Sequence, residues 1–370
     1  MAVYLAPRAV RNSGLGELSP AQISRYLDDR NAQAQPYISE ATEGVAGVSD
    51  TADVETMFQL MHLYMTQPRV DDQAFAEAAN VGDIILSLSV SDPDWQQALA
   101  YLEARHGEAI GWFNLVASQE RLDSLTPEAL FSLYQQRFGG VDDLVVVVVG
   151  DVDRDVVEQM ARTYVGTLPA GEPDSYVNRR APEPSGIVRR EVVLGPDVQS
   201  TSATYYYEAS IEVNPATQVA VDLLDVILDD RLVDDVREDL GDSYVATVSM
   251  GLSITPESRV SSEVFVSGDP ERMPRIEAEL ARILDGMQAG EINAEEFEQA
   301  RAVVGDDYEL TDNGDLTNVL IRRVYADDDE LPTPQRLIEE LAAIRLGHVQ
   351  ALAELLFDPD QHIQIIRVLP

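Results

Sequence analysis

One arrangement of residues occurs twice in this chain, and it constrains the fold more than any other feature of the sequence. The first copy contains a helix start, Phe138, a polar turn and an apolar run that begins at Leu144. The second copy ends the chain, with Phe357 and Ile363 in the corresponding places. Phe357 follows Phe138 by 219 residues, and Ile363 follows Leu144 by the same number. A repeat without a gap between its anchors predicts a duplicated unit made of both helices and strands.

A stretch rich in proline and glycine is the best candidate for a domain boundary. Residues 169–185 hold four prolines among polar neighbours, a composition that is typical of the segments between compact domains. A length of 370 residues also fits two domains. We therefore predict a first α+β domain at residues 1–172, a linker at 173–185 and a second α+β domain at 186–370.

Local patterns predict helices and strands in both domains. Residues 144–149 are a continuous run of leucine and valine, which is typical of a strand covered on both faces. A long helix is expected from about Pro215 to Leu240, where Gly241 stops it. The other expected strands are 187–194, 202–207, 245–254, 260–266 and 363–369. The other expected helices are 20–29, 51–64, 73–86, 95–105, 126–137, 153–164, 270–287, 294–308, 316–325, 334–344 and 347–357.

The chain carries a strong excess of negative charge. Its formal net charge is −40, and all 26 of its basic residues are arginines. A surface of this sign repels polyanions, which argues against nucleic acids and anionic membranes as partners. The charge favours solubility and is typical of a halophilic or otherwise acid-biased set of proteins. The first ten residues do not resemble a signal peptide, and the compartment stays open between cytoplasm and periplasm.

The sequence lacks the usual patterns of a metal or nucleophile site. No histidine has a second histidine three to five residues away, so neither H-E-x-x-H nor H-x-x-E-H is present. The acidic run at residues 327–330 lacks the ligand spacing and the glycine of a calcium loop. The absence of cysteine excludes thiol nucleophiles and cysteine-ligated zinc. We therefore expect no metal ligand in this chain, including its four histidines, His62, His106, His348 and His362.

One local pattern indicates a binding role. Arg237 lies in the last turn of the expected long helix, Gly241 ends that helix, and Tyr244 begins the next strand. A guanidinium and a phenol at one rim can both donate hydrogen bonds to one carbonyl or oxyanion. The alternative is that both residues have a structural role. Arg237 then pairs with Asp234 or Glu238 and stabilises the helix end, and Tyr244 is a packing residue.

At these residues the chain resembles the pitrilysin and insulin-degrading family of metallopeptidases, the inverzincins. The zinc-less half of that family carries an R-x-x-L-G-x-x-Y-like segment at a helix end, and residues 237–244 match it. Two further stretches agree in the expected order, 138–153 with 166–169, and 43–47 followed by 53–69. The second of them is similar to the C-terminal halves of the large bacterial members, and the likeness covers nearly the whole chain.

The resemblance implies an α+β fold of processing-peptidase type, with two homologous domains that each hold an antiparallel sheet of about six strands flanked by helices. In the family, a zinc-bearing half carries H-x-x-E-H, whose glutamate is the general base. The other half contributes an arginine and a tyrosine that hold the substrate carbonyl and stabilise the oxyanion, and Arg237 and Tyr244 match these positions. The chain is thus expected to be the non-zinc half, with zinc in a homologous partner half and a peptide as substrate.

Two departures from the family bear on this expectation. The zinc motif is absent, so the chain alone is expected to be inactive, and the alternative is a non-catalytic peptide-binding or scaffold subunit with the same fold. The opening strands of the first domain are reduced, with Val3–Leu5 as the remaining candidate. This indicates either a separate subunit or a C-terminal portion of a longer protein. The first sheet is then incomplete, and its exposed edge needs a partner strand.

Overall fold

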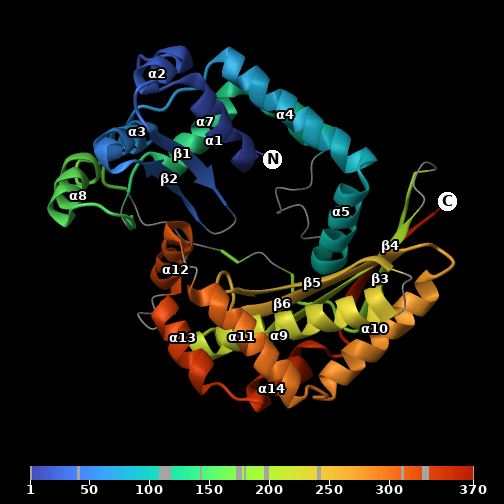
Figure 1. The fold of residues 1–370 in the computed structure, drawn as a ribbon. Coiled ribbons are helices and arrows are strands. Elements are labelled where there is room, and N and C mark those ends of the chain that lie inside the picture. The colour runs from blue at the N-terminus through green and yellow to red at the C-terminus, as the bar shows by residue number, and fades with distance from the viewer. Residues whose placement is uncertain are drawn as a thin grey trace. The chain divides into compact units, whose positions relative to one another are not determined.

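The chain folds as two compact units, both of which are visible in Figure 1. The first unit comprises Met1–Trp95 with Ala109–Arg179, and the second comprises Gln96–Glu108 with Arg180–Pro370. Both contain helices and strands, which confirms the predicted α+β class. The structure, a computed structural model, describes residues 2–39, 42–107, 118–141, 144–171, 177–178, 181–195, 200–239, 243–309, 312–326 and 333–369.

The second unit is built on a five-stranded sheet. Its strands lie in the order β3-β7-β4-β6-β5, with β3 parallel to β7 and the other neighbouring pairs antiparallel. Valine, isoleucine, threonine and tyrosine are frequent in these segments and favour strands. The strand bounds are β3 (Ile187–Val193), β4 (Thr201–Ser210), β5 (Ser243–Ser253), β6 (Arg259–Gly268) and β7 (His362–Val368).

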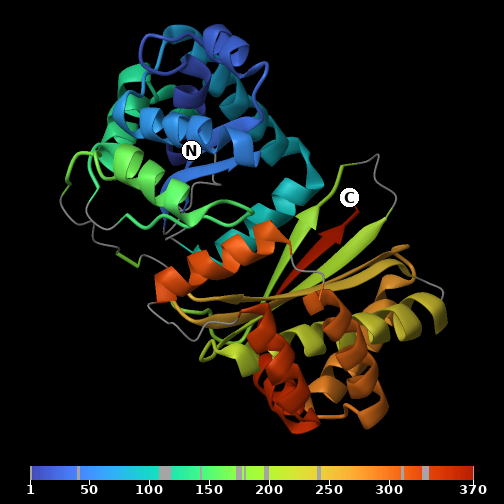
Figure 2. The ribbon, with the colours of Figure 1, turned by 60° about the vertical axis from the view of Figure 1, so that its left-hand side comes forward.

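Helices cover one face of this sheet (Figure 2). α9, α10 and α14 contact the strands directly, and α11 and α13 pack on α9. Their apolar residues form one core with the inward-facing residues of the sheet, and its burial from water is the main stabilising contribution. The helix bounds are α9 (Pro215–Arg231), α10 (Met273–Gln288), α11 (Ala294–Glu309), α12 (Asn313–Ala326), α13 (Pro334–Ala343) and α14 (Leu346–Leu356).

Helix α5 (Pro93–His106) packs on the opposite face of the same sheet, although the first unit supplies the chain before and after it. Its Ala104 lies in an apolar cluster with Ile363 of β7. Its Tyr101 ring stacks on Tyr206 of β4, with 4.0 Å between the ring centroids. Strands β7 and β4 are therefore covered on both faces, which suits their apolar sequences.

The first unit combines a two-stranded sheet with a set of helices. β1 (Ala32–Ile38) pairs antiparallel with β2 (Glu43–Ser49), and α1 packs against β1, α4 and α7. No single helix in the described part of the chain is long and apolar enough to cross a membrane, and α4 with α5 meets the criterion only as a bent pair. The helix bounds are α1 (Ala2–Ser13), α2 (Pro20–Leu27), η1 (Thr51–Asp53), α3 (Val54–Thr66), α4 (Asp72–Ser91), α6 (Gln119–Asp123), α7 (Pro127–Phe138), α8 (Arg154–Met160) and the π-helix η3 (Ala161–Val165).

The strand predicted at Val3–Leu5 is wrong, because these residues lie in α1. Leu5, Ala6, Ala9 and Val10 are buried, and a spacing of one, four and five residues puts them on one face of a helix. Burying that face in the core of the first unit outweighs the weak strand preference of a short apolar run.

The strand predicted at residues 144–149 is also wrong, since the segment has no regular secondary structure. Val145 and Val146 are 53% and 37% exposed. Valine favours extended backbone, but a strand also requires neighbours for its backbone hydrogen bonds. Among the described residues of the first unit, the only sheet is the β1–β2 pair. The segment thus has the sequence of a strand without a ladder.

Candidate functional site

Arg237 lies in the π-helix η4 (Leu232–Asp239), which continues α9 without a break. The expected long helix is therefore α-helical only as far as Arg231. Val236 is fully buried in the core of the second unit and so fixes the backbone on either side of it. The side chain of Arg237 lies outside the described part of the chain, as do residues 240–242 with the predicted glycine stop.

Two arginine ion pairs hold this helix end in place. Arg231 makes a two-pronged contact with Glu296, with N–O distances of 2.7 and 2.9 Å. On α10, Arg282 contacts Asp235 at 2.7 Å. Burial by itself raises the pKa of the Glu296 carboxyl, but hydrogen bonds from Arg231 and from the Asn293 backbone outweigh burial and lower it. The junction of α9 and η4 is therefore tied to both α10 and α11.

Tyr244 lies at an irregularity near the start of β5. The register of β5 on β6 passes from the pair Ser243–Gly268 directly to the pair Val245–Ser267, so Tyr244 is the extra residue of a β-bulge. A bulge re-aims a side chain away from the regular alternation of a strand. The Tyr244 side chain is accordingly 57% exposed. This exposure shows that Tyr244 is not part of the buried core.

The Tyr244 hydroxyl donates a hydrogen bond to Oδ1 of Asp269 at 2.5 Å. Asp269 directly follows β6, and its other carboxylate oxygen lies 3.7 Å from Nε of Arg272. The hydrogen bond to Asp269 is the main cause of a raised pKa of Tyr244. The phenol is therefore protonated at neutral pH, and it donates its one proton to Asp269 at the edge of the sheet.

The described residues do not fit a metal centre. Within them, no group of three or more histidine, cysteine or acidic side chains could hold a metal ion. Nδ1 of His348 accepts a hydrogen bond from the Arg345 backbone, and Nδ1 of His62 lies 2.6 Å from the Tyr164 carbonyl oxygen. The other two histidines are buried, and the acidic run at residues 327–330 lies outside the described residues. No catalytic step is therefore assigned to a metal in this chain.

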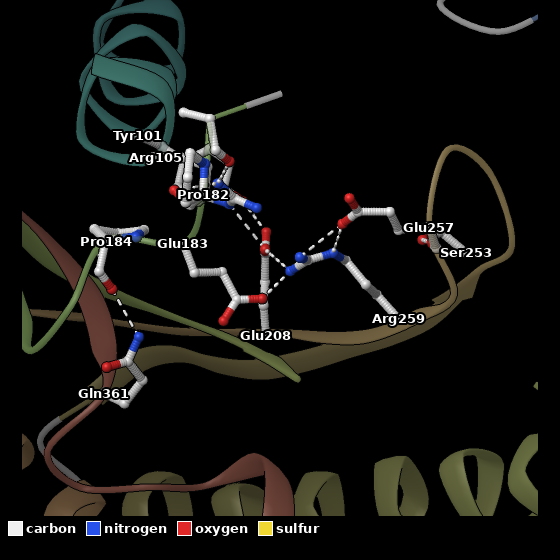
Figure 3. A network of polar contacts seen from close by, with 11 residues as sticks. Tyr101, Arg105, Pro182, Glu183, Pro184, Glu208, Ser253, Glu257, Arg259 and Gln361 are labelled. Carbon is white, nitrogen blue, oxygen red and sulfur yellow. Dashed lines mark hydrogen bonds and ion pairs between the residues drawn. The ribbon is translucent and has the colours of Figure 1, made fainter. Parts of the chain in front are cut away.

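A network of charged residues fixes α5 on the sheet of the second unit (Figure 3). Glu208 of β4 lies at its centre, and its Oε2 accepts from Arg105 at 2.8 Å and from Arg259 at 3.2 Å. Its Oε1 accepts from the Tyr101 hydroxyl at 2.9 Å. Arg259 also pairs with Glu183. Because the Arg105 side chain is only 3% exposed, its charge depends on Glu208 for compensation.

The same network holds the segment that leads into β3. Arg105 donates to the carbonyl oxygens of Ala181 and Pro182 at 3.0 and 3.4 Å. Gln361 donates to the carbonyl oxygen of Pro184 at 2.7 Å (Figure 3). This network could not be predicted from the sequence, because 103 residues separate Arg105 from Glu208 and no local pattern joins them.

The sequence is similar to known peptidases. Residues 124–304 match the model of the peptidase M16 inactive domain. The chain is 23% identical over 340 residues to the probable zinc protease PqqL of Escherichia coli (strain K12). The aligned part covers 88% of this chain and 35% of that protein, so the chain spans about a third of the length of this curated relative.

Comparison of the structure agrees with the sequence match. The match to the crystal structure of the periplasmic protease PqqL from Escherichia coli spans 100% of this chain and 41% of that chain, with a TM-score of 0.84 and 18% identity. The peptidase M16 inactive domain from Pseudomonas fluorescens covers 100% of this chain and 88% of that chain, with a TM-score of 0.80 and 17% identity. The first half of PqqL covers 98% of this chain and 82% of that chain, with a TM-score of 0.75 and 13% identity. The chain is therefore similar to the zinc protease PqqL in sequence and to peptidase M16 structures in fold, and its residues 124–304 match the inactive domain of the peptidase M16 family.

Proposed function

We propose that this chain is the non-zinc half of an M16-type metallopeptidase, and that it binds peptide and holds the scissile carbonyl with Arg237 and Tyr244. The observation that carries the proposal is the exposed, protonated hydroxyl of Tyr244. A bulge aims it out of the sheet directly after the segment that bears Arg237. Bulges often lie next to active sites, where they direct a side chain.

The role follows from the charge that develops on the substrate. When a peptide carbonyl is attacked, its oxygen becomes an anion, and donors already fixed around that oxygen lower the barrier. A phenol and a guanidinium both donate hydrogen bonds at neutral pH. In the proposed assembly, the partner half would hold zinc, which would supply activation of the attacking water. The residues of this chain bind and orient the carbonyl.

Asp269 is a positioning residue for Tyr244 in this proposal. In the free chain, its carboxylate accepts the hydrogen bond of the phenol and so limits the directions in which the hydroxyl points. When a peptide binds, the substrate oxygen takes the place of the Asp269 oxygen as acceptor. The bond to the carboxylate is charge-assisted and stronger than a bond to a neutral carbonyl. The exchange therefore becomes favourable as negative charge develops on the substrate oxygen.

The comparisons support a homologous partner half. PqqL is described as a zinc protease. This chain matches 41% of the whole PqqL chain with a TM-score of 0.84 and 18% identity, and it matches the first half of PqqL with a TM-score of 0.75 and 13% identity. The different scores favour two different matching segments in PqqL. A protein in which two segments share one fold is built from two related halves. The partner of this chain is thus a zinc-bearing homologous half, in the same polypeptide or in a separate subunit.

The test uses the chain assembled with a zinc-bearing homologous half and a fluorogenic peptide. We expect Tyr244→Phe and Arg237→Ala each to lower kcat by about 10²–10³, the scale for loss of one oxyanion donor. Tyr4→Phe is a matched control, because Tyr4 is 52% exposed and lies on α1 of the first unit; its kcat should not change. Unchanged kcat in both site variants would remove the assigned role. Peptide binding without hydrolysis by the assembly would support a non-catalytic scaffold instead.

A further inference from the structure

The segment at residues 144–149 has the sequence of a strand, and no strand in the described part of the first unit pairs with it. Val145 and Val146 are exposed, whereas Val148 packs against the cluster that contains Phe58. One side of the segment is thus held by the first unit and the other is open. An exposed β-branched run outside a ladder is a template for pairing with another strand.

The second unit shows what the equivalent segment does when its neighbours are present. A spacing of 219 residues separates Val54 at the start of α3 from Met273 at the start of α10. The starts of α7 and α14 have the same separation, as do the ends of β2 and β6. At this spacing, residues 144–149 correspond to residues 363–368, which belong to β7.

The contacts inside the two units repeat as well. In the first unit, α1 packs against α4, α7 and β1, and in the second, α9 packs against α11, α14 and β5. α3 packs on β2 as α10 packs on β6. Phe138 and Phe357, which are equivalent, are both buried. The units therefore follow one plan, in which α1 corresponds to α9 and the β1–β2 pair corresponds to β5–β6.

This plan leaves two strand positions of the first unit empty among its described residues. In the second unit, β4 lies between β7 and β6 and is antiparallel to both, and β3 lies on the outer side of β7 and is parallel to it. The described part of the first unit contains no counterpart of β3 or β4. On the shared plan, one strand would lie between residues 144–149 and β2. Adjacent strands are about 4.8 Å apart, so the plan requires a separation of about 10 Å between these two segments.

We propose that residues 144–149 and the edge of β2 form an acceptor site for a strand–loop–strand segment of polypeptide from outside residues 2–369. Its first strand pairs parallel with the outer edge of residues 144–149, as β3 does with β7. Its second strand enters between residues 144–149 and β2, antiparallel to both, as β4 does. This is strand addition to an open sheet, and it does not depend on the role of Arg237 and Tyr244.

The second unit also indicates the chemistry of the occupant. β4 is buried at every position from Thr201 to Tyr205, so the inserted strand is apolar or small on both faces. β3 is mostly exposed, with Val192 buried, so the outer strand is amphipathic. Together they would cover the valine side chains of residues 144–149 and satisfy the backbone groups of that segment.

The first experiment is hydrogen exchange, followed by mass spectrometry, on the chain alone. We expect residues 144–149 and β2 to exchange faster than β7 and β6 by on the order of a hundredfold or more, because only the latter pair lies inside a complete sheet. Slow exchange of residues 144–149 in the monomer would overturn the proposal. Slow exchange that appears only in a dimer would also overturn it, since a second copy of the chain would then be the occupant.

The second experiment supplies a strand donor. A second copy of residues 186–219, which spans β3 and β4, is fused ahead of Met1, so that the 219-residue spacing is kept and the copy runs into α1. We expect exchange at residues 144–149 to slow by on the order of tenfold or more. Val145→Pro in the fused protein should abolish that slowing, because proline cannot donate to a ladder. In the unfused chain, the same substitution should leave the exchange of β7 unchanged. A fused protein with an intact second unit and no slowing at residues 144–149 would refute the acceptor site.

Discussion

At Tyr244, a β-bulge and the carboxylate of Asp269 determine the direction of the side chain. The bulge takes the phenol out of the alternation of β5, and the hydrogen bond to Asp269 holds its hydroxyl at the surface. Water competes for a hydrogen bond in such an exposed place, so this contact adds little to the stability of the fold. It orients the donor instead.

Replacement of Asp269 tests this reading directly. We predict that Asp269→Asn lowers the pKa of Tyr244 toward the ordinary tyrosine value of about 10, because the hydrogen bond and the negative charge of the carboxylate are what raise it. The measurement is a titration of tyrosinate absorbance for each protein against the same protein with Tyr244→Phe, which isolates this residue from the other tyrosines. An unchanged titration curve would show that Asp269 does not control the phenol.

A second residue-scale effect concerns Asp225 on α9. Burial raises the pKa of its carboxyl to about 6 from 3.8, Asp229 and Asp222 add to the rise, and a hydrogen bond from the Met250 backbone offsets only part of it. The folded chain therefore holds this proton more tightly than the unfolded chain. As a result, the contribution of Asp225 to the free energy of unfolding falls as pH rises from about 4 to about 6, and the cost persists above that range.

We predict that Asp225→Asn raises the free energy of unfolding at pH 7 by about 1 kcal/mol, after allowance for solvent screening of a half-buried group. At pH 4 the variant and the parent chain should differ little, because the folded parent is already protonated at this position. Urea unfolding at the two pH values measures the difference. Asp234→Asn, at an exposed position of η4, is the control, and its free energy of unfolding should stay close to that of the parent chain in both measurements.

At the scale of elements, the attachment of α5 depends on one shared carboxylate. Glu208 compensates both Arg105 and Arg259. We predict that Glu208→Gln lowers the free energy of unfolding of the second unit by about 3 to 5 kcal/mol, the range for leaving a buried charge without its partner. Glu257→Gln is the matched control, since Glu257 contacts the same Arg259 but is 47% exposed; its cost should be about 0 to 1 kcal/mol. Equal losses in denaturant unfolding would refute a central role for Glu208.

Helix starts could be predicted from the sequence because their chemistry is local. The helices that begin after Ser19, Thr126, Asn214 and Thr333 each combine a side-chain cap with a proline in the first turn. The cap satisfies an amide that has no partner in the helix, and the proline fixes the first turn. All the necessary atoms lie within four residues of each other, so no tertiary information is required.

Strands could be predicted less well, because a ladder depends on residues far away in the chain. The run at residues 144–149 has high strand preference and no ladder, whereas β1, with Pro36 and two glutamines, forms one with β2. The bulge at Tyr244 depends on the register of β5 on β6, which no property of residues 237–244 encodes. The order of the segments and the residue types thus predicted Arg237 and Tyr244 as candidates. The exposure of Tyr244 and its hydrogen bond to Asp269 could be seen only in the structure.

At the scale of the whole molecule, the repeat of 219 residues explains why the fold class was accessible from sequence. Equivalent helices in the two units start at the same spacing as the equivalent phenylalanines, Phe138 and Phe357. What the repeat could not show is the attachment of residues 96–106 to the second unit, because only contacts with β4 and β7 reveal it.

That attachment has a consequence for how the molecule comes apart. If a protease recognition sequence is inserted after residue 175 and cut, the N-terminal fragment keeps Tyr101 and Arg105, which bind the sheet formed by the C-terminal fragment. We predict two bands on a denaturing gel and a single peak in gel filtration; two separate peaks would contradict this. The two fragments would then stay together without a peptide bond between them. A recombinant fragment that begins after residue 175 would lack α5, which belongs to the second unit.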